Sequence, residues 1–121
     1  KDSRLRERNF GSWEGRLFSE YGAASPDDKS EVESNQIIQK RIFEFLQDIG
    51  KSELIGNNVL IVSHGGVLKN IIVKLLDLEN SFNEINCKNA AYLIITYSED
   101  VGWNIKELNG IELPLSLATS L

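Results

Sequence analysis

The feature that most constrains the fold is a short apolar run followed at once by a histidine, two glycines and an amphipathic helix. The run is Val59-Leu60-Ile61-Val62, and residues 63–66 read Ser-His-Gly-Gly. A wholly apolar, β-branched run of this length is typical of a strand buried on both faces, as in a parallel sheet. The helix is expected to end near Asp77, and its apolar face comprises Val67, Leu68, Ile71, Ile72, Leu75 and Leu76.

The rest of the pattern predicts one earlier helix and a later β-hairpin. Ser34 or Asn35 can cap a helix that runs to about Ile49, with Gly50 as its stop. The other expected elements are a helical turn (16–21), an exposed loop (22–31), a short strand (85–88), and two strands (91–97 and 103–108) that pair through a turn (98–102) and end at 109–110. This order predicts one α/β domain over residues 1–121, with the second helix as a crossover.

The composition excludes several classes of function. The 121 residues carry a formal net charge of −5, and 41% of them are hydrophobic and 26% charged. An acidic surface repels nucleic acid and anionic membranes, so neither is expected as a partner. The chain has one cysteine, Cys87, which cannot form an internal disulfide and therefore fits a reducing, cytoplasmic setting. With only one cysteine and one histidine, a dedicated metal site is improbable.

His64 lies where the predicted inner strand ends and the helix begins. Ligands of open α/β sheets bind at the carboxyl ends of strands, and the free N–H groups of a helix's first turn attract anions. The glycines allow a close approach, and an imidazole can donate a hydrogen bond to a phosphoryl oxygen. The junction therefore favours a phosphate site over the alternative, a histidine that only stabilises a turn.

A second candidate segment comprises residues 4–15, where arginines and Glu7 precede two aromatic residues and two glycines. Charges alone would indicate a solvated loop. Phe10 and Trp13, however, favour burial, and as packing anchors they would fix the loop against the sheet and orient Glu7. A carboxylic acid near a phosphate pocket can protonate a leaving alkoxide and later activate water.

Together these segments resemble the histidine phosphatase (phosphoglycerate mutase-like) superfamily. Residues 5–15, Leu-Arg-Glu-Arg-Asn-Phe-Gly-Ser-Trp-Glu-Gly, look like the family's L-x-E-x-x-F-G-x-W-E-G block. Residues 59–66 look like its second-histidine block, and Val32-Glu33-Ser34 is similar to its G-E-S before a helix. The resemblance covers roughly residues 4–112, and residues 103–110 resemble the usual last strand.

The resemblance implies a three-layer α/β/α sandwich with a mostly parallel central sheet, and a phosphohistidine mechanism without a cofactor or metal. A first histidine attacks the phosphoryl group, which splits one displacement into two. By motif position, Glu7 is the acid and then the base, and His64 is the second histidine. Gly65 would offer its backbone N–H, and Arg8 would border the substrate.

The chain departs from the family in lacking the R-H-G motif that carries the nucleophile, and the Ser/Arg/Thr block that supplies another arginine. Because residues 5–15 normally follow both, we interpret the chain as the C-terminal portion of the domain. We expect that ~60–80 preceding residues, which include the N-terminal strands, are absent, because this is the typical span of two βα units. The alternative is a degenerate homologue. The chain by itself is expected to be inactive.

Trp13-Glu14-Gly15 looks more like the phosphatases of the family than the glycolytic mutases, so the resemblance implies hydrolysis of a small phosphorylated metabolite. Phosphoglycerate mutase, an isomerase, remains the alternative within the family. A non-catalytic, phosphate-binding pseudo-phosphatase is the alternative of another class. Specificity is expected in the loop 22–31, and a homodimer remains open.

Overall fold

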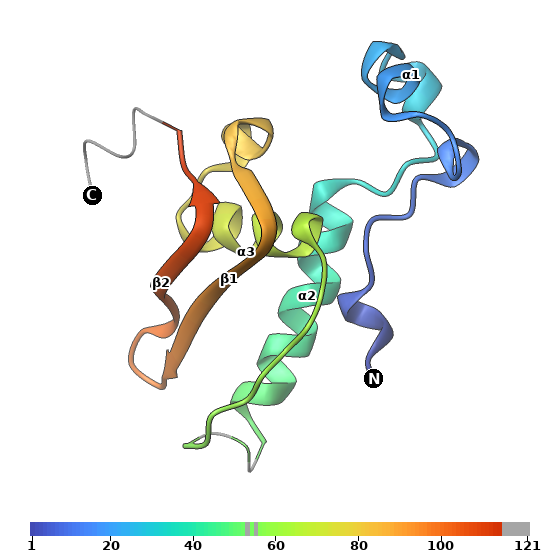
Figure 1. Ribbon diagram of the computed structural model, residues 1–121. Helices are drawn as coiled ribbons and strands as arrows, with labels where there is room; N and C mark the ends of the chain where they lie inside the picture. The colour runs from blue at the N-terminus through green and yellow to red at the C-terminus, as the bar shows by residue number, and fades with distance from the viewer. Residues whose placement is uncertain (53, 55, 115–121) are drawn as a thin grey trace.

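The computed structural model describes residues 1–52, 54 and 56–114, in which two helices pack on each other and on a β-hairpin (Figure 1). The sheet has two antiparallel strands. The main elements are α1 (Phe18–Ala23), α2 (Asn35–Gly50), α3 (Gly65–Leu75), β1 (Asn86–Ser98) and β2 (Gly102–Glu112). Short 3-10 helices are Ser3–Leu5, Gly11–Trp13, Asp27–Lys29 and Glu79–Glu84. Helices with a sheet agree with the predicted α/β class.

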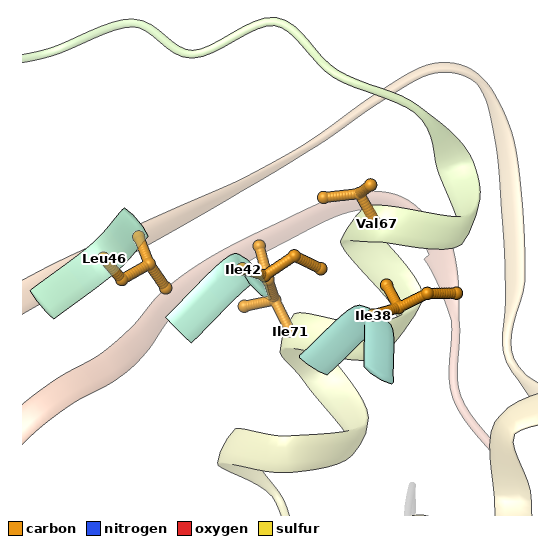
Figure 2. Packing of buried hydrophobic residues seen from close by; sticks show 5 residues of the cluster. All are labelled: Ile38, Ile42, Leu46, Val67 and Ile71. Carbon is orange, nitrogen blue, oxygen red and sulfur yellow. The ribbon is translucent and has the colours of Figure 1, made fainter. Parts of the chain in front are cut away.

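Helix α2 begins and ends close to the predicted residues. The Ser34 side chain accepts a hydrogen bond from the Ile37 N–H at 3.2 Å, which caps one of the free donors of the first turn. Its apolar side chains repeat every four residues, and Ile38, Ile42 and Leu46 are at most 1% exposed. Figure 2 shows these three side chains together with Val67 and Ile71 of α3. This packing fixes α3, and therefore its first turn, relative to α2.

Helix α3 also packs on the hairpin. Its residues Ile72 and Val73 form a second buried cluster with Ile85, against side chains of β1 and β2 such as Leu93 and Ile105. Because α3 has apolar neighbours on both the α2 and the hairpin sides, it is the central element of the fold. The predicted helix after residues 63–66 is confirmed.

The hairpin is longer than the sequence predicts. Residues 85–88 and 91–97 were expected as separate strands and 109–110 as the end, but β1 is continuous and β2 extends to Glu112. The pairing register with β2 shifts between Cys87 and Tyr92. This irregularity lets residues 88–91 remain within the continuous strand β1. Gly110 makes this feasible: its φ is 71°, and a Cβ there would lie 3.3 Å from that of Ala91.

The prediction of a buried strand at residues 59–62 is wrong for this structure. Val59 and Ile61 are 43% and 39% exposed, Leu60 and Val62 are 90% and 85% exposed, and the segment belongs to no strand. A strand requires a hydrogen-bonded neighbour, and none of the described segments pairs with this one. An apolar cavity of about 290 Å³ lies between it and β1, with Tyr92 among its lining residues. The described residues therefore form no parallel sheet and no three-layer sandwich.

The α2–α3 contact predicts a large difference between two isoleucines of α2. Ile42→Ala removes a fully buried side chain and is expected to lower the free energy of unfolding by about 2–5 kcal/mol. Ile37→Ala is the matched control, because Ile37 is 56% exposed, and should change it by less than about 0.5 kcal/mol. Urea unfolding of both variants measures the difference, and equal effects would contradict this packing.

Candidate functional site

The two sequence motifs meet at the first turn of α3, although they are almost 60 residues apart. The Ser63 hydroxyl donates a hydrogen bond to the Leu5 carbonyl at 2.6 Å. The Gly66 N–H donates to Oε2 of Glu7 at 3.4 Å. The structure therefore brings the carboxylate of the early motif onto the helix that follows the histidine motif.

The backbone of His64 caps α3, but its imidazole does not. His64 is extended (φ −127°, ψ 160°), and its carbonyl accepts hydrogen bonds from Val67 and Leu68, both at 3.1 Å. Its side chain makes no capping bond, so the N–H groups of the first turn remain available to other acceptors. The Glu7 carboxylate uses that of Gly66, where the positive end of the helix dipole favours a negative group.

Gly66 is required by this contact. A Cβ at this position would overlap with the Glu7 carboxylate. Oε1 of Glu7 also accepts the N–H of Arg8 at 2.9 Å, so the carboxylate is bound on both sides. Gly65 is exposed, and a Cβ on it would lie 4.0 Å from the Cβ of Cys87, which places the half-buried thiol beside the same turn.

His64 is exposed and lines a hollow that Glu7 does not line. This hollow, of about 600 Å³, is also lined by Lys1, Arg6 and the apolar segment 59–62. Among the described residues, neither Glu7 nor Arg8 lines it. The Glu7 carboxylate is thus bound to Gly66, two residues after His64, but Glu7 does not line the hollow that His64 lines.

Arg8 is half-buried against elements that follow the early motif. Its guanidinium donates to the Glu33 carbonyl at 2.6 Å and to the side chain of Asn35, and it lies 5.4 Å from the centre of the Phe82 ring. Burial lowers the pKa of Arg8 from its usual value, although a guanidinium stays charged. The Lys69 ammonium lies 5.2 Å from the centre of the same ring, so two cations lie against Phe82.

Arg41, a residue that no sequence motif predicts, fixes the segment of Glu7. Its guanidinium forms an ion pair with Glu33 at 2.9 Å, and both side chains are less than 10% exposed. It also donates to the carbonyls of Arg4, Arg6 and Glu7. The available signal was an arginine on the apolar face of α2, between Ile38 and Ile42 in helical spacing.

The aromatic residues of the early motif pack differently from the prediction. Phe10 and Trp13 were expected to fix the loop against the sheet. They instead pack edge-on against Tyr21 of α1, with ring centres 5.3 Å and 5.9 Å away. Figure 1 shows α1 far from the hairpin. The aromatic cluster lies within residues 10–21. The segment of Glu7 is fixed by the buried Arg41 instead.

The arrangement and the motifs agree with a comparison with known families. The sequence profile of the histidine phosphatase superfamily, branch 1, matches residues 1–110.

The chain belongs to the histidine phosphatase superfamily.

Within this superfamily, the chain is similar to a protein of Hydrogenobacter thermophilus (strain DSM 6534 / IAM 12695 / TK-6) named "Putative phosphoserine phosphatase 2". The two are 36% identical over 103 residues, which cover 74% of this chain and 49% of the relative. The chain therefore spans about half of the length of the curated relative that it matches.

Two further observations concern the residues that the structure describes. No group of three or more histidine, cysteine or acidic side chains among them could hold a metal ion. None of the helices in residues 1–52, 54 and 56–114 is long and apolar enough to cross a bilayer.

The buried ion pair predicts a pH-dependent stability. The hydrogen bonds from Arg41 hold the pKa of Glu33 below the ordinary 4.5 of a glutamate. The stabilisation is therefore fully present above about pH 4.5 and is lost as pH falls through the lower pKa of the folded state. At pH 7, Glu33→Gln should lower the free energy of unfolding by on the order of 3 kcal/mol, as expected when a buried pair loses one charge.

Unfolding by urea between pH 7 and pH 3 measures this effect. The difference between wild type and Glu33→Gln should shrink toward acid pH. The control is Glu20→Gln in the exposed Arg16–Glu20 pair, which should cost less than about 1 kcal/mol at every pH. A difference for Glu33→Gln that stays constant down to pH 3 would contradict the ion pair.

Proposed function

We propose that the intact protein is a phosphatase that hydrolyses a small phosphorylated metabolite through a phosphohistidine intermediate. Membership of the superfamily and the phosphatase name of the relative support a phosphatase. The single observation that carries the proposal for this site is the Glu7 carboxylate on the first-turn N–H of the helix that His64 caps. This contact supports an acid and base role for Glu7, because a helix N-terminus favours anions such as phosphate and a carboxylic acid near a bound phosphate can transfer protons.

In the proposed first step, a histidine nitrogen forms a bond to phosphorus and the bond to the substrate oxygen breaks. Glu7 gives its proton to the leaving alkoxide. In the second step, Glu7 takes a proton from water, the water oxygen bonds to phosphorus, and the bond from phosphorus to histidine breaks. His64 and the N–H of Gly65 hold phosphoryl oxygens, and Arg8 borders the rest of the substrate. We place the nucleophile outside these 121 residues, because His64 is their only histidine.

We further propose that residues 59–62 form an inner strand in the intact protein. Their side chains are apolar on both faces, yet they are exposed here; they border an apolar cavity on the β1 side and a more polar hollow on the N-terminal side. Additional strands supplied by the other half of the domain would cover them and complete a three-layer sandwich with a mostly parallel sheet. Accordingly, the chain by itself is proposed to be inactive.

Phosphoserine is the first substrate to test, because the similar protein is named for it. A phosphoglycerate mutase would instead return the phosphoryl group to a second position of its substrate. A pseudo-phosphatase would bind phosphate without turnover. Both alternatives are outcomes of the following experiment.

Variants of the two proposed catalytic residues are expected to lose phosphatase activity. In the intact protein, Glu7→Gln should lower kcat by ~10²–10⁴-fold because it removes the acid and base. His64→Ala should lower it by ~10²–10³-fold because it removes a donor to the developing negative charge. The measurement is phosphate release from phosphoserine and from p-nitrophenyl phosphate.

Glu44→Gln is the matched control, because Glu44 is exposed on α2, and it should keep normal turnover. Labelled phosphate trapped on histidine after rapid denaturation would support the intermediate. Normal turnover in both Glu7→Gln and His64→Ala would show that the site is assigned wrongly. Phosphate binding without any turnover by the wild type would favour the pseudo-phosphatase.

A further inference from the structure

The guanidinium of Arg41 divides its donors between the Glu33 carboxylate and the backbone of the segment around Glu7. Nε and Nη2 each donate to a carboxylate oxygen of Glu33 at 2.9 Å, and Nη2 also donates to the Glu7 carbonyl at 3.4 Å. Nη1 donates to the carbonyls of Arg4 and Arg6 at 2.7 and 2.8 Å. An arginine has five N–H groups, so these five bonds exhaust its capacity.

Glu33 holds the same segment from its other end. Its backbone N–H donates to the Asn9 carbonyl at 2.8 Å, and its Oε1 accepts the N–H of Asn9 at 3.1 Å. Its carbonyl accepts a hydrogen bond from the Arg8 side chain at 2.6 Å. Glu33 and Arg41 thus bind the backbone on both sides of Glu7.

The segment around Glu7 depends on these bonds because residues 6–10 form no helix or strand of their own. Arg41 is 7% exposed and lies on α2 next to Ile42, which is fully buried in the core that also holds α3. The ion pair therefore connects the Glu7 backbone to the same rigid core that fixes Gly66. A displacement of about 1 Å in a catalytic group can cost ~10²-fold in rate.

From this geometry we propose that Arg41 and Glu33 are positioning residues that set the Glu7 carboxylate for proton transfer to the leaving group. The inference rests on the proposed function, and it adds two residues to the catalytic apparatus that contact no substrate. Lysine cannot replace Arg41, because an ammonium lacks the planar fork that reaches a carboxylate and three carbonyls together.

A test must separate positioning from a purely structural role. Breaking the P–O bond of an alkyl phosphate needs an acid to protonate a poor leaving group, whereas p-nitrophenolate leaves readily without one. Loss of the acid should therefore lower kcat/KM more for phosphoserine than for p-nitrophenyl phosphate. A variant that is merely less folded loses both activities by the same factor.

The experiment compares Arg41→Lys, Glu33→Gln and Glu7→Gln in the intact protein, with kcat/KM expressed per molecule that forms the phosphoenzyme. Arg16→Lys is the matched control, because Arg16 is in an exposed ion pair. The measured quantity is kcat/KM for phosphoserine divided by kcat/KM for p-nitrophenyl phosphate. Arg41→Lys and Glu33→Gln should each lower this ratio by about 10-fold or more, as Glu7→Gln does. The decrease should stay within the ~10²-fold expected of a misplaced catalytic group. Arg16→Lys should leave the ratio unchanged.

The outcomes distinguish the two proposals. If Glu7→Gln shifts the ratio but neither Arg41→Lys nor Glu33→Gln does, the positioning role is overturned and the proposed function stands. If the wild type turns over neither substrate, or if Glu7→Gln leaves the ratio unchanged, the proposed role of Glu7 is overturned and the positioning role with it. If Arg41→Lys does not fold, Glu33→Gln decides, because glutamine keeps the size and hydrogen-bonding oxygen of Glu33.

Discussion

The hydrogen bond from the Gly66 amide to the Glu7 carboxylate is the interaction on which the site depends. It forms because the imidazole of His64 leaves the first-turn donors of α3 free and because Gly66 has no side chain to block the approach. The two partners are fixed through one core: α3 packs on α2, and α2 carries Arg41, which binds the Glu7 segment. A change in the α2 core can therefore reach the site through two routes.

The exposed apolar segment 59–62 lies directly before this first turn. Ser63 links it to Leu5, but its backbone takes no part in a described strand. Exposure of four consecutive apolar side chains is costly in water, because each would gain free energy from burial. The proposed fold of the intact protein, in which further strands cover this segment, would remove this cost.

Local patterns were enough to predict α2, α3 and the pairing of the hairpin, because caps and helical spacing are encoded within a few residues. The family resemblance predicts Glu7 and His64 as partners in one site; the structure brings the Glu7 carboxylate to Gly66, two residues after His64, and their shared catalytic role stays a prediction. The prediction of a strand at residues 59–62 is wrong for this structure, because a strand needs a hydrogen-bonded neighbouring strand and local sequence does not show whether one is present. Arg41 was missed because its contacts reach 34 to 37 residues back to Glu7, Arg6 and Arg4, and no periodicity reports such contacts.

The most direct test of the central claim is a crystal structure of the intact protein with vanadate, which mimics a phosphoryl group in transfer. Our account predicts that oxygens of one vanadate lie about 3 Å from both the His64 imidazole and the Glu7 carboxylate, the range needed for proton transfer. A vanadate bound to His64 while the Glu7 carboxylate remains on Gly66, out of reach of every vanadate oxygen, would contradict the account.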